Sequence, residues 1–239
     1  MTDILAPTAG APNRWLAATV RDIQRWPGYG VRLRFDVPGR PPHLPGQHYV
    51  IRLVAPDGYS AQRSYSLASD PEDAEIELFV ERLADGEVSP YLVDEVQVGD
   101  RLSVRGPIGG WFTWSGETPM LGLAGGSGAV PFVSMLRHAA TLARQDLVSL
   151  AVSARTIDRL PYAEELRNAG ALIALTRKTS PAGRPSGRLT TAELEPLVAG
   201  RDGFYVCGSH SFAEGMSHSL VSVGAAMTQI RVERFGPSG

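Results

Sequence analysis

The sequence contains a single cysteine, Cys207, among its 239 residues. One thiol excludes a disulfide within the chain, and it excludes an iron–sulfur cluster held by several cysteines of these residues. The five histidines do not show the close spacing of metal-binding pairs, so we expect no metal site.

Long apolar runs and a strong charge of either sign are also missing. No apolar run reaches the roughly 18 residues that a membrane-spanning helix needs, and no basic region followed by an apolar stretch opens the chain. The formal net charge of −2 argues against nucleic acid as the main partner, because such binding needs a basic face. We therefore expect a cytoplasmic monomer that binds neither membranes nor nucleic acid.

The first half of the chain has the pattern of a small β-domain. Residues 1–13 show little periodicity and are expected to form a flexible tail. In residues 14–114, short alternating segments are separated by frequent turn signals, which predicts an antiparallel β-barrel. The expected strands cover residues 15–24, 30–37, 49–54, 62–69, 74–83 and 99–107, and a short helix is expected at 89–93 with Ser89 as its N-cap.

The second half, residues 115–239, has a different pattern. Residues 120–124 form a continuous apolar run, which is typical of a strand buried on both faces of a parallel sheet. Strands that alternate with helices predict an α/β doubly wound parallel sheet. The expected strands cover 120–124, 147–153, 171–176, 203–207 and 229–235, and the expected helices cover 131–144, 162–169, 190–199 and 212–223. The sequence thus predicts two domains.

One expected strand of the barrel carries polar residues suited to a cofactor. Alternation places Arg63 and Tyr65 on one face of this strand, and Ser64 and Ser66 on the other. Arginine offers several donors to a phosphate, tyrosine a flat ring, and serine a hydroxyl that reaches a ring nitrogen. A cofactor-binding strand and an ordinary edge strand both have this pattern.

A glycine-rich segment follows the first apolar strand of the second half. Gly125, Gly126, Ser127 and Gly128 precede the expected helix, which has Pro131 in its first turn. Glycines let backbone amides approach a pyrophosphate, and a helix N-terminus adds a positive dipole end. The position at the end of a parallel strand favours a phosphate-binding loop over a plain turn.

Taken in order, these segments resemble the ferredoxin–NADP reductase family. Arg63-Ser64-Tyr65-Ser66 is similar to its flavin-binding strand, Gly86-Glu87-Val88-Ser89 to its flavin-diphosphate segment, and the glycine-rich segment to its pyridine-nucleotide loop. The resemblance implies that Arg63 pairs with the flavin pyrophosphate, that Tyr65 packs against the flavin and that Ser66 hydrogen-bonds near N5. It also implies that residues 86–89 hold the diphosphate.

Two further segments match the same family near the end of the chain. Cys207-Gly208 ends an expected strand, and Glu233-Arg234-Phe235-Gly236 is similar to the C-terminal segment of the family. The resemblance implies that Cys207 and Glu233 position the nicotinamide and that Phe235 covers the flavin ring. Together with Ser66, Cys207 and Glu233 are the expected catalytic residues.

The choice between NADPH and NADH depends on residues after the second and third strands of the expected sheet. Ser153 and Arg155 follow the second strand, and Arg177 follows the third. An acid at the ribose favours NAD, whereas an arginine accommodates a 2′-phosphate. Resemblance to bacterial members implies that Arg155 and Arg177 contact this phosphate, which favours NADPH and leaves NADH as an alternative.

The resemblance implies an FAD-dependent oxidoreductase that takes hydride from NAD(P)H; FMN is the alternative flavin. The expected acceptor is a separate ferredoxin or the iron–sulfur component of an oxygenase. Two alternatives remain: a reductase of small acceptors such as free flavin, quinone or ferric chelate, and a flavin electron-transfer subunit that does not turn over alone.

Overall fold

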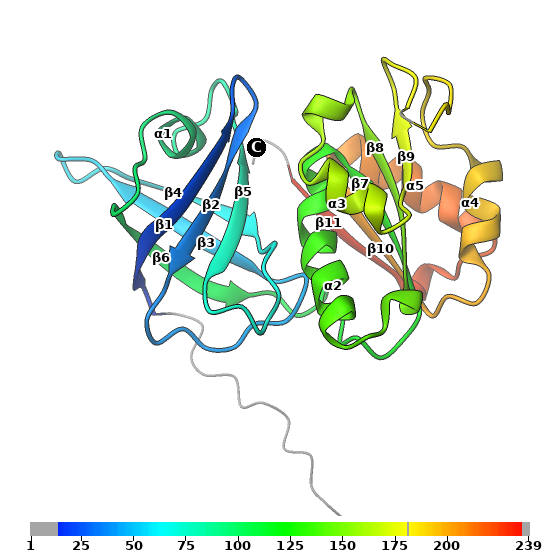
Figure 1. Ribbon diagram of the computed structural model, residues 1–239, viewed down its shortest axis with the longest axis horizontal. Coiled ribbons are helices and arrows are strands. Elements are labelled where there is room, and N and C mark those ends of the chain that lie inside the picture. The colour runs from blue at the N-terminus through cyan, green and yellow to red at the C-terminus, as the bar shows by residue number, and fades with distance from the viewer. Residues whose placement is uncertain (1–13, 181, 236–239) are drawn as a thin grey trace, which may run out of the picture.

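The computed structural model describes residues 14–180 and 182–235, which form two lobes side by side (Figure 1). The first lobe is a six-stranded antiparallel sheet in the order β4-β3-β6-β1-β2-β5. Its elements are β1 (Leu16–Trp26), β2 (Gly30–Asp36), β3 (His48–Val54), β4 (Ser60–Ser66), β5 (Ile76–Glu81), α1 (Ser89–Asp94) and β6 (Arg101–Ile108). Each strand and the helix expected in this half of the chain are confirmed.

The two strands at the ends of this order meet and close the sheet into a barrel. Leu67, just after β4, forms a β-bridge with Leu78 of β5. The backbone N–H of Ala68 donates a hydrogen bond of 2.8 Å to the carbonyl oxygen of Glu77. Alternation along the strands turns apolar side chains inward, where they form one buried cluster.

The second lobe is a five-stranded parallel sheet in the order β11-β10-β7-β8-β9. Its strands are β7 (Met120–Gly125), β8 (Val148–Ala154), β9 (Leu172–Leu175), β10 (Gly203–Gly208) and β11 (Ile230–Arg234). Helices α2 (Val130–Thr141) and α3 (Ala163–Asn168) cover one face, and α4 (Thr191–Val198) and α5 (His210–Ser222) cover the other (Figure 1). This confirms the doubly wound α/β fold.

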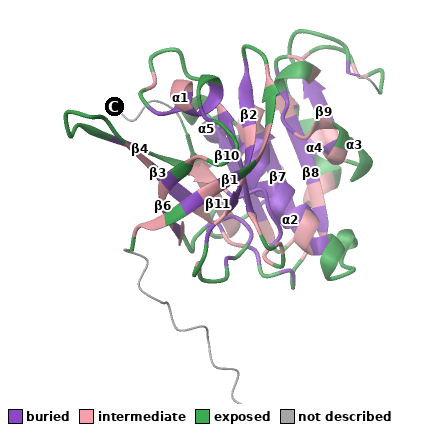
Figure 2. Cartoon of the chain, turned by 60° about the vertical axis from the view of Figure 1, so that its left-hand side comes forward, coloured by how far each residue is buried: buried purple, intermediate pink, exposed green. Residues whose placement is uncertain are grey.

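The middle strand, β7, is buried on both faces, as its apolar run predicts (Figure 2). Met120 and Ala124 pack in the cluster beneath α2, and Leu121 and Leu123 pack in the cluster beneath α4 and α5. The chain proceeds from β7 to β8 and β9 on one side, and returns to β10 and β11 on the other. Such a reversal opens a crevice at the carboxyl ends of the strands, where ligands bind in α/β sheets.

The two lobes share a hydrophobic cluster. Phe112, from the segment between β6 and β7, lies edge-to-face with Phe132 of α2 at 5.8 Å and with Tyr205 of β10 at 5.4 Å. Trp114 is 1% exposed in the same cluster. The domain boundary at residue 114 falls between the two sheets and stays a prediction; the expected tail, residues 1–13, lies outside the described residues.

A charged side chain also joins the lobes. Arg137 of α2 donates a hydrogen bond of 2.9 Å to Glu77 of β5 and one of 3.0 Å to the carbonyl of Ala68, and it pairs with Glu165 of α3 at 2.8 Å. Because Glu77 is only 5% exposed, its negative charge is shielded from water and needs the nearby Arg137 guanidinium to stabilise it. The contact fixes α2 against the barrel and so positions the crevice between the lobes.

No helix within residues 14–180 and 182–235 has the length and apolar character needed to cross a membrane.

Candidate functional site

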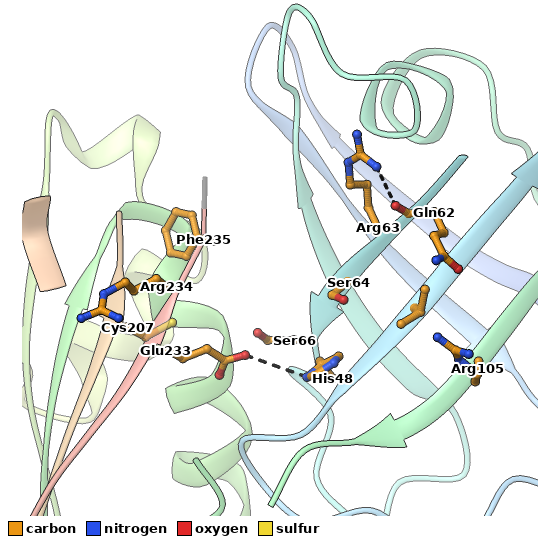
Figure 3. Close-up of a pocket in the computed structure, with 11 residues that line it drawn as sticks. His48, Gln62, Arg63, Ser64, Ser66, Arg105, Cys207, Glu233, Arg234 and Phe235 are labelled. Atoms are coloured by element: carbon orange, nitrogen blue, oxygen red, sulfur yellow. Dashed lines mark hydrogen bonds and ion pairs between the residues drawn. The ribbon is translucent and has the colours of Figure 1, made fainter. Parts of the chain in front are cut away.

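A cavity of about 430 Å³ lies between the two lobes, and its walls come from different sheets (Figure 3). The barrel contributes side chains from three adjacent strands, and the α/β lobe contributes the carboxyl ends of β10 and β11. The barrel residues are His48, Val50, Gln62, Arg63, Ser64, Ser66 and Arg105; the opposite residues are Cys207, Glu233, Arg234 and Phe235.

Strand register explains the barrel wall. Ser66 pairs with His48, and Ser64 pairs with Val50, so these side chains share the face that borders the cavity. The small serine and valine side chains leave a shallow wall with hydroxyl groups along it. Tyr65 points the other way and packs against the buried cluster of the barrel, where burial raises the pKa of its hydroxyl. The structure therefore does not place Tyr65 in this wall.

The expected diphosphate segment, residues 86–89, lines neither this cavity nor the second one described below. Ser89 is the first residue of α1 and is 4% exposed, and its hydroxyl accepts a hydrogen bond of 3.1 Å from the N–H of Leu83. The N-cap is Val88, so the sequence expectation of Ser89 as N-cap was wrong. A Cβ on Gly86 would lie 2.7 Å from the Ser89 hydroxyl, which explains this glycine by packing.

Arg63 lies at the edge of the cavity, beside one member of this segment. Its Nη2 is 3.5 Å from a carboxylate oxygen of Glu87, and its Nη1 donates to the carbonyl of Gln62 at 2.7 Å. Glu87 also accepts a hydrogen bond from Tyr59. The side chains of Arg63 and Glu87 are each 47% exposed, so this pair is weak and Arg63 can turn to a phosphate at little cost.

The opposite wall holds two neighbouring groups that can lose a proton, the thiol of Cys207 and the carboxyl group of Glu233. Cys207 and Glu233 are partners in the parallel ladder of β10 and β11. Burial raises the pKa of the Cys207 thiol, with a smaller contribution from Glu233, so the thiol stays protonated near neutrality. Burial also raises the pKa of Glu233 to about 7. One oxygen of Glu233 lacks a hydrogen-bond partner in the described structure, and the other lies 3.9 Å from Nδ1 of His48.

A second cavity, of about 660 Å³, opens at the carboxyl edge of the parallel sheet. Residues at or just after all five strands contribute to it. They are Gly125, Gly126 and Ser127 at the end of β7; Ser153, Ala154, Arg155 and Thr156 at the end of β8; Thr176 and Arg177 after β9; Ser209, Ser211 and Phe212 after β10; and Phe235 after β11. Phe235 lines both cavities.

Four arginines make the second cavity strongly positive. Arg159 is engaged, because it donates to the carbonyl of Gly28 at 2.8 Å. The side chains of Arg155, Arg177 and Arg188 have no hydrogen-bonding or ionic partner among the residues that the structure describes. Unpaired guanidinium groups around a cavity are suited to an anion that carries several charges.

The glycine-rich segment forms a 3₁₀ turn, Gly126–Ala129, before α2. Gly126 has a φ of +58°, which favours glycine. A Cβ on Gly128 would lie 2.3 Å from the carbonyl oxygen of Cys207, so this glycine lets the turn pack directly on the end of β10. Gly208 similarly leaves room for the ring of Phe212. Gly128, Pro131 and Gly208 are buried and do not line the cavity.

Several residues that line the two cavities were not expected from the sequence. Ser209 directly follows Cys207-Gly208 at a strand end, so its position was a usable signal. Arg188 lies in a loop far along the chain, and only the fold brings it to Arg155. The lining residues not expected from sequence include His48, Gln62, Arg105, Arg159, Arg188, Ser209 and Ser211.

Among the described residues, no group of three His, Cys, Asp or Glu side chains is arranged to hold a metal ion. The donor set of the first cavity fits a flat, phosphate-bearing group instead. It has a shallow wall with two hydroxyls, the amide of Gln62, and cations at its edge, Arg63 and Arg105.

Comparison with known proteins agrees with this chemistry. Residues 30–113 match the family model of the oxidoreductase FAD-binding domain. The chain is 29% identical over 240 residues to the ferredoxin–NAD(P)(+) reductase component of the naphthalene 1,2-dioxygenase/salicylate 5-hydroxylase systems of Ralstonia, covering 95% of this chain and 71% of the relative. It is 27% identical to the 2-halobenzoate 1,2-dioxygenase electron transfer component of Burkholderia cepacia, covering 86% and 62%. The chain thus spans less than two thirds of that relative's length.

Solved structures show the same two-lobed fold. The FAD/NAD-binding domain of nitric oxide dioxygenase from Vibrio cholerae superposes with a TM-score of 0.81 at 25% identity, covering 93% of this chain and 99% of that domain. A ferredoxin NADP+ reductase from Neisseria gonorrhoeae superposes with a TM-score of 0.79 at 20% identity, covering 92% and 98%. This agreement confirms the architecture expected from the sequence.

Proposed function

We propose that this chain, which belongs to the FAD-binding oxidoreductases related to ferredoxin–NAD(P)+ reductase components, transfers hydride from NAD(P)H to FAD and then electrons to an iron–sulfur protein. The observation that carries the proposal is the arrangement of the two cavities. They share Phe235, and the carboxyl ends of β10 and β11 lie between them. A donor nucleotide in one and a flavin in the other would meet there.

The cavity between the lobes is the proposed flavin site. FAD supplies the redox chemistry when bound, because its ring accepts a hydride and releases electrons singly or in pairs. Ser66 offers a hydroxyl to a ring nitrogen, Arg63 and Arg105 offer donors to phosphate, and Cys207 and Glu233 shape the opposite wall. FAD is favoured over FMN because an FAD-binding domain model matches residues 30–113.

The positive cavity at the edge of the sheet is the proposed nucleotide site. The amides of the glycine-rich turn and the N-terminus of α2 are suited to the pyrophosphate. The unpaired side chains of Arg155, Arg177 and Arg188 support a third phosphate, at the 2′ position of the adenosine ribose. We therefore propose NADPH as the preferred donor.

The proposed acceptor is a ferredoxin or the iron–sulfur component of an oxygenase. Supporting observations are the relatives described as reductase or electron transfer components of dioxygenases. We further propose that the protein is a monomer located in the cytoplasm. Sedimentation tests the oligomeric state, and cell fractionation tests the location.

The salt dependence of turnover tests the proposed acceptor. Reduction of ferredoxin should slow as the salt concentration is raised, because salt screens the attraction between the charged docking surfaces. Turnover with small acceptors alone would favour the free-flavin, quinone or ferric-chelate reductase; failure to turn over with any acceptor would favour the subunit.

The decisive experiment mixes the flavin-loaded protein anaerobically with NADPH or NADH and follows flavin absorbance in a stopped-flow instrument. We expect both NADPH and NADH to bleach the flavin, and we expect NADPH to do so faster or at a lower concentration. Equal bleaching would retain the oxidoreductase and contradict the 2′-phosphate site. Absence of bound flavin after reconstitution with FAD and FMN would overturn the proposal.

A further inference from the structure

A tyrosine of the barrel lines the positive cavity of the α/β lobe. Among the described residues around that cavity, Tyr29 and Glu81 are the two that come from the barrel. Tyr29 lies in the turn between β1 and β2, directly before Gly30, and Gly30 pairs with Glu81 at the end of β5. The barrel therefore brings one phenol and one carboxylate, from neighbouring strands, to the carboxyl edge of the parallel sheet.

The position of the Tyr29 ring is fixed by contacts that do not involve its hydroxyl. The backbone N–H of Tyr29 donates to the carbonyl of Trp26 at 3.0 Å, and its own carbonyl accepts from the N–H of Arg82 at 2.8 Å. The ring packs against Phe79 with a centroid distance of 5.5 Å, and the guanidinium carbon of Arg159 lies 5.2 Å from the ring centroid. A phenylalanine would satisfy all of these contacts, so packing alone does not explain the hydroxyl.

The hydroxyl of Tyr29 is a buried donor without a partner. The residue is 4% exposed, and its hydroxyl makes no hydrogen bond to any residue that the structure describes. A buried hydroxyl left in this state lowers the stability of the protein. Burial, and to a lesser extent the carboxylate of Glu81, raises the pKa of Tyr29, so the hydroxyl stays protonated and able to donate. An acceptor on a ligand in the cavity would complete it.

The surroundings of this hydroxyl favour a phosphate group as that acceptor. Glu81, which is close enough to affect the Tyr29 hydroxyl, accepts a hydrogen bond from Ser127 in the glycine-rich turn. Arg159, on the other side, is anchored to the same hairpin through the carbonyl of Gly28. Tyr29 is thus tied to the turn whose amides suit a pyrophosphate and to a guanidinium group. Phosphate oxygens accept hydrogen bonds, and donors of this kind bind them most strongly when the acceptor is charged.

We propose that the hydroxyl of Tyr29 donates a hydrogen bond to the diphosphate of the bound nicotinamide dinucleotide, so that the donor nucleotide contacts the barrel as well as the α/β lobe. The inference rests on the proposed function, because it adds a binding residue to the proposed nucleotide site. NADPH and NADH both carry the diphosphate, so Tyr29 contributes equally to both. In this respect it differs from Arg155 and Arg177, whose proposed contact is the 2′-phosphate.

The first test measures binding of NADP+ and NAD+ to the flavin-loaded protein by calorimetry. Tyr29→Phe removes the hydroxyl and keeps the ring with its packing. Tyr91→Phe, on α1, is the matched control, because Tyr91 also belongs to the barrel and lines neither cavity. We expect Tyr29→Phe to raise the Kd of both dinucleotides by about tenfold, and Tyr91→Phe to change neither. An unchanged Kd in Tyr29→Phe would overturn the inference, and so would a loss confined to NADP+.

The second test separates ligand binding from a structural role of the hydroxyl. A hydroxyl that holds the fold together would lower the stability of the protein when removed. Because the Tyr29 hydroxyl has no partner in the described structure, we expect the urea midpoint of nucleotide-free Tyr29→Phe to equal or exceed that of the wild type. Saturating NADP+ should raise the midpoint of the wild type more than that of the variant. A lower midpoint of the nucleotide-free variant would contradict the proposed role.

The third test uses probes that each carry one part of the nucleotide. Inorganic pyrophosphate and adenosine 2′-phosphate are titrated with the flavin-loaded protein by phosphorus NMR. We expect Tyr29→Phe to weaken pyrophosphate binding by about tenfold and to leave adenosine 2′-phosphate binding unchanged. Equal pyrophosphate binding by wild type and Tyr29→Phe would overturn the contact with the diphosphate. If the wild type binds neither dinucleotide and its flavin is reduced by neither NADPH nor NADH, the proposed function fails, and the pyrophosphate titration still decides whether Tyr29 binds a diphosphate.

Discussion

The hydroxyl of Ser127, in the turn before α2, donates a hydrogen bond of 2.6 Å to the carboxylate of Glu81 at the end of β5. This contact joins the glycine-rich turn to the barrel across the lobe boundary. Glu81 is also the one carboxylate among the described residues of the positive cavity. A negative group therefore stands beside the place proposed for the phosphates of the nucleotide.

Neutralising Glu81 should strengthen nucleotide binding. Two unit charges about 4 Å apart in water repel by ~1 kcal/mol, which is about a fivefold change in affinity. We expect Glu81→Gln to lower the Kd for NADP+ by about that factor, measured by calorimetry. The exposed Glu195→Gln on α4 is the matched control and should leave the Kd unchanged. Weaker binding in Glu81→Gln would mean that the carboxylate accepts a hydrogen bond from the nucleotide.

Arg155 and Arg177 should discriminate between the two dinucleotides. A hydrogen bond to a charged group contributes about 1.5–3 kcal/mol, so each replacement by glutamine should raise the Kd for NADP+ at least about tenfold. The Kd for NAD+ should change less than about twofold, because NAD+ lacks the 2′-phosphate. Arg21→Gln, on the barrel, is the control. Equal losses for both dinucleotides would place these arginines elsewhere on the ligand.

Removing the Arg137 side chain should destabilise the protein, because the buried carboxylate of Glu77 would lose its closest cationic partner. The side chain of Glu77 is 7% exposed, and its other cations, Arg32 and Arg34, stand at 3.9 Å. We expect Arg137→Met to lower the free energy of unfolding in urea by about 3 kcal/mol. Arg21→Met breaks an ion pair whose side chains are 52% and 37% exposed, and should cost less than about 1 kcal/mol. Similar effects of the two changes would show that Glu77 is not dependent on Arg137.

Glu233 should make stability depend on pH in a defined direction. Its pKa rises from 4.5 to about 7 in the folded state, so between these values the folded protein holds a proton that the unfolded chain has lost. This contribution is complete below about pH 4.5 and is lost as the pH rises through 7, by up to about 3 kcal/mol. Urea unfolding of wild type and Glu233→Gln across this range checks it. The wild type should lose stability relative to the variant as pH rises; a constant difference would contradict a raised pKa.

The elements of the fold could be predicted because they depend on local patterns. Alternation along residues 30–37 predicted β2, and the apolar run at 120–124 predicted β7, since period and burial follow directly from residue type. The carboxyl ends of the parallel strands were recognisable for the same reason. The sequence therefore identifies Ser153, Arg155 and Arg177 as strand-end residues, and the fold brings all three to one cavity.

Local patterns were less informative about side-chain partners. Ser89 has the residue type of an N-cap, yet its hydroxyl accepts a hydrogen bond from the N–H of Leu83, in the segment between β5 and α1. Tyr65 lies in the expected cofactor strand, yet its ring belongs to the barrel interior, because the serines beside it take the face that borders the cavity. The resemblance identified the strand, and the packing decided which of its faces borders the cavity.

The sequence by itself determined the two sheets, their order along the chain and the phosphate-suited strand ends, because each depends on residues that are neighbours in sequence. Tertiary structure alone decided that His48 meets Glu233 and that Ser127 meets Glu81, since each pair spans the two lobes. Such contacts depend on how α2 and β11 pack against the barrel. That geometry is set by many buried contacts acting together, and no local pattern contains it.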